Sequence, residues 1–228
     1  KKRLFQKTVK KSLENLKANK IDFVYGFPNK MALKSQVKGG YELIKLPFNF
    51  SRAILDINPI IKDKKTNNNF FTILKLHIIK YIWFLTFKQL INIRKKNNSN
   101  IKILDKKAAK DLKNFYNEWN KNNPDLMMIK RNWDYYNWRY TLNPYRKHII
   151  SGFYKNKKLE GIIICGIQRN KGQNKIHIMD LMYTNTYILN ELIQWSLYFG
   201  KKMNAISIDM WSEKTKKKKS LINYFIKN

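Results

Sequence analysis

Few side chains in this chain combine a type and a setting suited to acid–base chemistry, and one of them is a carboxylate in an apolar strand. Asp180 follows the run Ile176–Met179, whose apolar residues predict a buried strand. Burial among apolar neighbours raises the pKa of a carboxyl group. Asp180 is therefore the candidate catalytic residue, and a structural aspartate at the end of a strand is the alternative.

Histidine and cysteine, which supply most metal ligands and many nucleophiles, are scarce. The three histidines and the single cysteine match no metal-ligand spacing, so we expect no metal site. Cys165 lies in an apolar run, where a lone cysteine is most often an inert core residue. A single cysteine cannot form a disulfide within the chain, which favours a reducing compartment and predicts a cytoplasmic protein.

A capped helix between two strands is predicted around Asn29. Its side chain can accept a hydrogen bond from a backbone N–H of the first helical turn. Ala32 and Gln36 have i, i+4 spacing and share one face of this helix. Gly40 can adopt the left-handed conformation that ends a helix. The predicted elements are a strand over Ile21–Phe27, a helix over Asn29–Val37 and a strand over Gly40–Leu46.

This segment resembles the C-terminal signature of the GNAT acyltransferases, N-x-x-A-x-x-x-Y-x-K-x-G-F. The matching residues are Asn29, Ala32, Lys38 and Gly40, with Tyr41 in place of Phe and Gln36 in place of Tyr. In that family the segment lines the pantetheine and thiol end of coenzyme A. The resemblance therefore implies that Asn29, Ala32 and Gln36 bind the cofactor. Because an amide cannot act as a general acid, the proton-donating role of the family's Tyr is in doubt at Gln36.

Family members also carry a glycine-rich loop before a helix whose N-terminus holds the pyrophosphate. An apolar stripe from Leu4 onward predicts that helix, but no glycine loop precedes it. The chain therefore resembles a fragment that begins inside a domain. Arg3 and Leu4 lie where the loop would end, so the resemblance implies that they contact the phosphates. A solvated basic terminus is the alternative.

The second half repeats the element order of a GNAT core. Asp105 predicts the start of a helix that runs through Trp119. The elements predicted next are strands His148–Tyr154, Glu160–Ile167 and Lys175–Tyr183, a helix Ile188–Gly200, a strand Ala205–Met210 and a helix Ser212–Asn228. Residues 184–187, at the position of the pyrophosphate loop, contain no glycine, which backbone needs to approach phosphate closely. We expect this half to keep the fold without binding coenzyme A.

An aromatic cluster precedes these strands and contains Trp138, Arg139 and Tyr140. Its pattern resembles the second half of bacterial GNAT-type proteins from cell-surface polysaccharide loci. Aromatic rings beside Arg can stack on bases or sugars, which would make the cluster part of an acceptor site. The alternative is a structural motif that packs beside the strand Glu160–Ile167, with Arg139 paired to a carboxylate or to carbonyl groups.

The formal net charge of +32 does not by itself predict a nucleic-acid partner. Lysine outnumbers arginine 40 to 7, and asparagine is abundant, as codon bias in an A/T-rich genome would produce. Arginine is the residue suited to bidentate phosphate and base contacts. We therefore expect weak, salt-sensitive binding to polyanions and no specific nucleic-acid partner.

Residues 70–93 are dense in Phe, Ile and Leu, with Lys and His between them. The uncharged stretch Tyr81–Phe87 is too short to span a bilayer. We expect a linker helix between two halves of the protein. Weak peripheral contact with an anionic membrane surface is the alternative.

These observations predict an α/β fold with a GNAT-like mixed, mostly antiparallel sheet flanked by helices, in two GNAT-like halves of which the first is truncated. The predicted division is residues 1–60, a linker over 61–100, and residues 101–228. The resemblance implies acyl transfer, most simply of acetyl from acetyl-CoA, to an amine such as an amino sugar of a surface polysaccharide. A catalytically inactive binding module is one alternative. A FemAB-like aminoacyl transferase acting on a peptidoglycan precursor is another.

Overall fold

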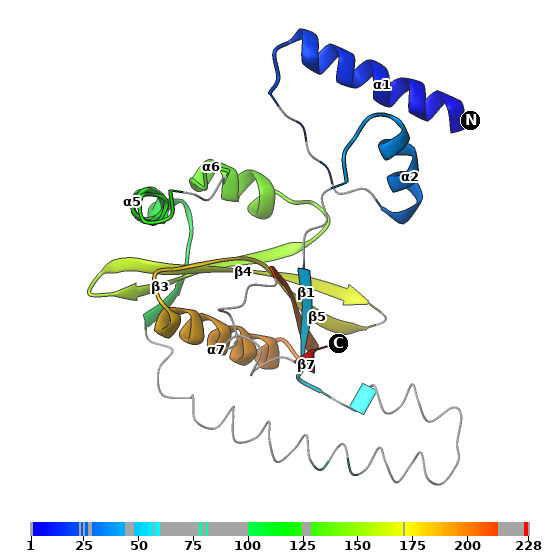
Figure 1. Ribbon diagram of the computed structural model, residues 1–228. Coiled ribbons are helices and arrows are strands. Elements are labelled where there is room, and N and C mark those ends of the chain that lie inside the picture. The colour runs from blue at the N-terminus through cyan, green and yellow to red at the C-terminus, as the bar shows by residue number, and fades with distance from the viewer. Residues whose placement is uncertain are drawn as a thin grey trace. The chain divides into compact units, whose positions relative to one another are not determined.

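The computed structural model forms two compact units, Lys1–Pro47 and Phe48–Asn228 (Figure 1). The described residues are 2–22, 24, 26, 29–43, 48–56, 58–59, 78, 81, 100–124, 129–170, 172–213 and 226–227. The first part of the predicted linker, residues 61–69, lies outside this set. Of the linker helix predicted over 70–93, only Ile78 and Tyr81 are described, and both are helical.

The first unit contains two helices, α1 (Lys2–Ala18) and α2 (Lys30–Lys38). Asn29 caps α2, because its Oδ1 accepts the backbone N–H of Ala32 at 2.8 Å. The helix ends in a Schellman motif, in which Gly40 has a φ of 109° and the N–H of Tyr41 donates to the carbonyl of Gln36 at 3.2 Å. The predicted helix, its cap and its glycine exit are confirmed.

The strands predicted on either side of α2 are wrong wherever the structure describes them. The described residues of Ile21–Phe27 have no regular secondary structure, and neither do residues 41–43 of the predicted strand Gly40–Leu46. Alternating apolar residues form a strand only when a second strand pairs with them, and the described part of the first unit provides helices instead.

The second unit is built on one mixed sheet, with strand order β2-β3-β4-β5-β6-β1-β7. The strands are β1 (Phe48–Ile54), β2 (Ile101–Ile103), β3 (Lys147–Lys155), β4 (Lys158–Asn170), β5 (Gln173–Tyr183), β6 (Ala205–Glu213) and β7 (Ile226–Lys227). The β5–β6 pair is parallel and every other described pair is antiparallel. The predicted mixed, mostly antiparallel sheet is therefore confirmed.

Helices cover both faces of this sheet (Figure 1). Helix α7 (Thr186–Lys202) packs on one face against a cluster that includes Ile163, Cys165 and Ile176. The other face is covered by α5 (Ala109–Lys121), by α6 (Trp133–Tyr136) and by the π-helical turn η3 (Asn137–Thr141) that continues α6. Burial raises the pKa of the Cys165 thiol to about 12, as expected for an inert core cysteine.

Strand β1 and the edge strand β7 were not predicted. All seven residues of β1 pair with β6, so residues 48–54, which the sequence placed in the first half, complete the sheet of the second unit. The helix predicted over Ser212–Asn228 is wrong where the structure describes it. Ser212 and Glu213 belong to β6, and Ile226–Lys227 form β7. β1 pairs with β6 and β7, which lie far from it in the sequence, so no local sequence pattern indicates these pairs.

Gly161 of β4 allows α7 to lie close to the sheet, and we predict that Gly161→Ala is destabilising. An added Cβ would come within 2.5 Å of Ile188 Cγ2 and 2.9 Å of Leu192 Cδ1. Overpacking of this kind should lower the free energy of unfolding by about 1–3 kcal/mol, measured by urea denaturation. Gly172→Asn is the control, because nothing lies within 4 Å of its Cβ position and Asn tolerates its φ of 77°. Equal midpoints for both variants would contradict the prediction.

The cap of α2 gives a second prediction. Replacing Asn29 by Ala leaves the N–H of Ala32 without its side-chain acceptor and should destabilise α2 by about 1 kcal/mol. Amide hydrogen exchange in residues 30–38 measures this change directly. Asn29→Asp keeps an acceptor at the same position and should preserve protection. Loss of protection in the Asp variant as well would show that the cap is not the cause.

Candidate functional site

Two parallel strands separate in the middle of the second unit's sheet. β5 and β6 are paired from Asn174↔Ala205 to Ile178↔Met210. Beyond Ile178, β5 remains paired with β4 on its other side as far as Tyr183. Beyond Met210, β6 remains paired with β1 as far as Glu213. Among the described strands, the facing edges of β5 and β6 therefore have no ladder partner here. Side chains already engage two backbone groups of this part of β5, because the N–H of Leu181 donates to Asp180 Oδ1 and the carbonyl of Tyr183 accepts the Nε1–H of Trp119.

A β-bulge on β5 lies at the point of separation. Ile164 of β4 pairs with Asp180, whereas the next residue, Cys165, pairs with Ile178. Met179 is the extra residue. A bulge bends a strand and changes the direction of the side chains that follow it. Ile178 accordingly lies on the α7 face with Cys165, and Asp180 lies on the opposite face with Ile164.

Helix α7 begins just after β5, where a GNAT-like protein would hold pyrophosphate. The residues between strand and helix include no glycine. The side chain of Asn185 caps α7 by accepting the N–H of Ile188 at 3.1 Å. One of the amide groups that an anion would use is therefore already occupied by the protein itself.

Asp180, the carboxylate identified from the sequence, forms an ion pair. Arg131 Nη1 lies 3.1 Å from Asp180 Oδ1, and the same oxygen accepts the N–H of Leu181 at 2.9 Å. Burial raises the pKa of Asp180, and the nearby Arg131 charge lowers it by less. A carboxylate engaged by two donors fits the structural alternative, because it fixes residue 131 against the bulge.

The aromatic cluster lies on α6 and η3. Tyr136 and Tyr140 are buried against Ile162 and Ile164, so packing beside the strand Glu160–Ile167 is confirmed. Trp138 is 66% exposed. The pairing expected for Arg139 is wrong within the described part of the chain. Its guanidinium lies over the Tyr140 ring, 5.7 Å from the centroid, and the carboxylate of Asp180 pairs with Arg131 instead.

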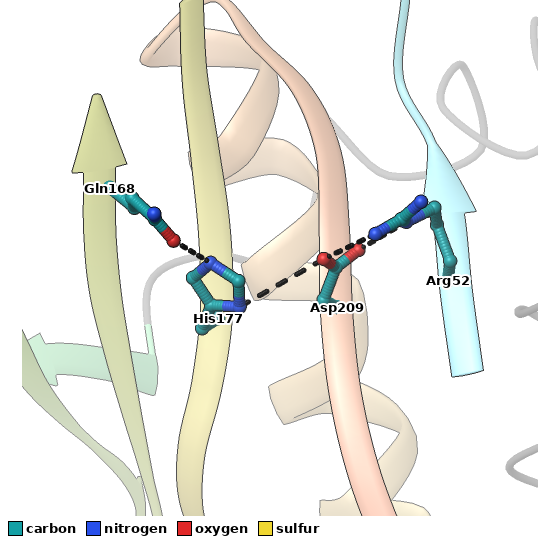
Figure 2. A network of polar contacts seen from close by, with 4 residues as sticks. All are labelled: Arg52, Gln168, His177 and Asp209. Atoms are coloured by element: carbon teal, nitrogen blue, oxygen red, sulfur yellow. Dashed lines mark hydrogen bonds and ion pairs between the residues drawn. The ribbon is translucent and has the colours of Figure 1, made fainter. Parts of the chain in front are cut away.

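A row of polar side chains crosses the sheet where β5 and β6 are still paired (Figure 2). It contains Gln168 of β4, His177 of β5, Asp209 of β6 and Arg52 of β1. Arg52 donates two hydrogen bonds to Asp209, from Nε to Oδ1 at 2.7 Å and from Nη2 to Oδ2 at 2.9 Å. His177 Nε2 lies 2.8 Å from Gln168 Oε1, and His177 Nδ1 lies 3.9 Å from Asp209 Oδ2.

This polar row faces away from α7. Its strand neighbours Ile176, Ile208 and Ala53 all belong to the cluster under α7, and side chains alternate between the two faces of a strand. The Asp209 side chain is 4% exposed, so its charge depends on the Arg52 guanidinium. Burial lowers the pKa of His177, and the Asp209 charge opposes this shift only in part.

An aromatic pair extends the row toward the separated strand ends. The Arg52 guanidinium lies 5.1 Å from the centroid of the Phe50 ring, and Phe50 packs on Trp211 with their centroids 5.1 Å apart. Trp211 is 67% exposed. Charged, polar and aromatic side chains therefore line one face of the sheet from β4 to β1.

Sequence reasoning missed this row, although one signal was present. Asp209 is a carboxylate within the apolar strand Ala205–Met210, and a buried charge requires a partner. The other residues proposed from the sequence lie in the first unit. Arg3 and Leu4 belong to α1, Asn29 is the cap of α2, and Ala32 and Gln36 lie within α2.

The described residues contain no group of three or more His, Cys, Asp or Glu side chains that could hold a metal ion. None of the described helices is both long enough and apolar enough to cross a membrane.

Comparison with solved structures shows a GNAT-like fold. A GCN5-related N-acetyltransferase from Anabaena variabilis aligns with 96% of this chain at a TM-score of 0.53 and 12% sequence identity. The chain spans 45% of the length of that protein. At this identity the likeness concerns the fold.

Two more solved structures have lower TM-scores. A functionally unknown conserved protein from Staphylococcus epidermidis aligns over 96% of this chain and 77% of its own, at 11% identity and a TM-score of 0.46. An N-myristoyltransferase from Saccharomyces cerevisiae, with bound myristoyl-CoA, aligns over 72% of this chain and 41% of its own, at 10% identity and a TM-score of 0.46. The sequence matches no protein-family model and no curated protein sequence.

The electrostatics of the polar row predict how His177 titrates. Because burial outweighs the attraction of Asp209, the pKa of His177 should lie below the ordinary value of about 6.5. Asp209→Asn removes the charge that raises this pKa, so the pKa should fall further. His148, whose pKa is also lowered by burial and not shifted by Asp209, is the internal control. Proton NMR titration measures both, and a rise of the His177 pKa in the variant would contradict the prediction.

The same shifts predict how these two histidines affect stability. A histidine with a lowered pKa binds a proton less readily in the folded protein than in the unfolded chain. The contribution of His148 and His177 to stability should therefore be complete above about pH 7 and be lost as the pH falls toward about 5. Urea denaturation of the single and double His→Gln variants isolates this contribution, because the loss should disappear only when both histidines are replaced.

Proposed function

We propose that this chain is part of an acyltransferase that moves an acyl group, most simply acetyl, from acyl-coenzyme A to an amine. The observation that carries the proposal is the separation of β5 and β6 beyond Ile178 and Met210. The pantetheine arm of coenzyme A is an extended chain with two amide groups. Such a chain can pair with unpaired strand edges in the way that an added strand does. The proposal departs from the expectation, based on the glycine-free loop before α7, that the second half does not bind coenzyme A.

The thioester would lie beside the bulge at Met179, where backbone direction changes. A backbone N–H there can polarise the thioester carbonyl as negative charge develops on its oxygen. The amine attacks as a nucleophile in its neutral form. The C–N bond forms, and the C–S bond breaks to release coenzyme A. We propose that the reaction takes place in the cytoplasm. The binding partners of the protein are then a small-molecule acyl donor and an amine acceptor.

The acceptor proposed is an amino sugar of a surface polysaccharide. Trp138, exposed beside Arg139, supports an acceptor with a ring that an aromatic face can pack against. The first unit, taken by itself, is an alternative location for the cofactor, where Asn29, Ala32 and Gln36 are the proposed contacts and Arg3 and Leu4 lie near its phosphates. The capped geometry of α2 supports this assignment, because its cap and its glycine exit reproduce the expected helix ends.

A catalytically inactive binding module is a second candidate, and one observation favours it. The loop before α7 contains no glycine, and Asn185 occupies an amide group at the start of that helix. A protein of this kind would retain the separated strand edges and bind a ligand there without transferring an acyl group.

The experiment that tests the proposal uses the 228-residue chain with acetyl-CoA and glucosamine. Acyl transfer predicts release of the coenzyme A thiol that depends on glucosamine and is absent with N-acetylglucosamine, whose nitrogen is already acylated. Binding measured at about 0.15 M and about 0.3 M salt separates a built site from attraction to a chain of +32 charge. Acetyl-CoA should shift the backbone amide resonances of residues 179–183 and 211–213. Binding without amine-dependent thiol release would favour the binding module.

A further inference from the structure

The polar row contains two hydrogen-bond acceptors that face each other without a donor between them. Gln168 Oε1 lies 2.8 Å from His177 Nε2, and this contact places the imidazole proton on Nε2. Nδ1 then carries a lone pair. It lies 3.9 Å from Asp209 Oδ2, which is too far for a direct hydrogen bond. Figure 2 shows His177 Nδ1 and the carboxylate of Asp209 facing each other. In this tautomer a lone pair therefore faces a carboxylate oxygen.

An ammonium group fits this pair. A cation that makes hydrogen bonds of about 2.8 Å to both atoms would lie about 2 Å to one side of the line that joins them. Arg52 occupies only part of the acceptor capacity of Asp209, since a carboxylate can accept about four hydrogen bonds. The hydroxyl of Ser207 is buried on the same face and has no hydrogen-bond partner among the described residues, so a further acceptor lies nearby.

Burial makes the two acceptors, His177 Nδ1 and Asp209 Oδ2, selective for a cation. Asp209 is almost fully covered, whereas the side chains of His177 and Arg52 are 25% and 36% exposed. A ligand would reach the pair past His177, on the face of the sheet opposite α7. A buried carboxylate attracts a positive charge more strongly than an exposed one, because water screens it less. Arg52, Arg146 and Lys175 carry the neighbouring positive charges, and each lowers the pKa of His177.

We propose, on the basis of the proposed acyl-transfer function, that His177 Nδ1 and Asp209 Oδ2 bind the primary ammonium group of the acceptor and that His177 is the base that deprotonates it. The position suits this role. His177 immediately precedes Ile178, the last residue of β5 that pairs with β6 before the strands separate. The amine is thereby held beside the strand edges where the thioester is proposed to bind.

The ammonium group gives one proton to His177 Nδ1, and Asp209 stabilises the imidazolium that results. The lone pair of the neutral amine then attacks the carbonyl carbon of the thioester. The C–N bond forms, the C–S bond breaks, and its electron pair leaves on sulfur. The nitrogen loses a second proton, which converts the thiolate to a thiol, and His177 returns its proton to solvent.

Gln168 is a positioning residue in this scheme. By accepting the Nε2 proton, it keeps the Nδ1 lone pair free. Gln168→Leu removes that acceptor, so the proton should move to Nδ1 and point at Asp209. The ammonium site would then be lost although His177 and Asp209 are both still present.

The test is NMR of the ¹⁵N-labelled 228-residue chain, titrated with glucosamine and, separately, with N-acetylglucosamine. Long-range ¹H–¹⁵N spectra should show the Nε2–H tautomer of His177 in the free protein. Glucosamine should shift the His177 ring resonances and lower the pKa of His177, because a cation beside the ring disfavours the imidazolium. N-acetylglucosamine should produce neither change. Asp209→Asn and Gln168→Leu should abolish the response, and His148→Gln should preserve it.

The outcomes separate this inference from the proposed function. An Nδ1–H tautomer in the free protein, or equal shifts with both sugars, overturns the inference. If thiol release depends on glucosamine, His177→Gln should slow it by roughly 10²–10⁴-fold, the range for loss of a general base. Transfer that is unaffected by this substitution would overturn the role of His177 and leave the acyl-transfer function standing. A His177 response without any thiol release would support the amine site and refute acyl transfer.

Discussion

The buried carboxylate of Asp209 constrains the polar row on the face of the sheet opposite α7. A charge in a nearly dry position is stable only when a donor neutralises it, and Arg52 does so with two hydrogen bonds. Arg52 comes from β1, which precedes the other sheet strands by a long stretch of chain. The ion pair therefore couples the pairing of β1 with β6 to the burial of Asp209. It also fixes the electrostatic surroundings of His177 on the next strand.

The bulge at Met179 has a similar organising effect at the separated strand ends. Without the extra residue, Asp180 would lie on the α7 face, among the apolar side chains that contact Ile188 and Leu192. With it, Asp180 lies on the opposite face and pairs with Arg131. One inserted residue thus keeps a charge out of the main core and anchors the segment that leads into α6.

The sequence predicted those elements whose signals are local. Alternating apolar residues located β3, β4 and β5, and the caps Asn29 and Asp105 located the starts of two helices. β1 and β7 escaped prediction because their partners are remote in the sequence.

The site was predictable only in part, because its residues also come from segments that lie far apart in the sequence. Asp180 was recognised as a carboxylate in an apolar strand. No partner was predicted for it, and the fold brings Arg131 to it. A sequence shows that a buried charge needs a partner, but the partner is chosen by tertiary packing. Arg52 of β1 and His177 of β5 both approach Asp209 of β6. No spacing within the sequence indicates that these three residues lie together.

The burial of Cys165 has a practical consequence for measuring distances in solution. It is the sole cysteine of the chain, and its thiol is fully buried with a pKa raised to about 12, so maleimide and disulfide reagents should not reach it. A cysteine introduced at any exposed position can then be labelled alone, with no need to remove the natural one. Pairs of such labels, one in α1 and one on the sheet, would report by fluorescence transfer or electron spin resonance how the two compact units are arranged.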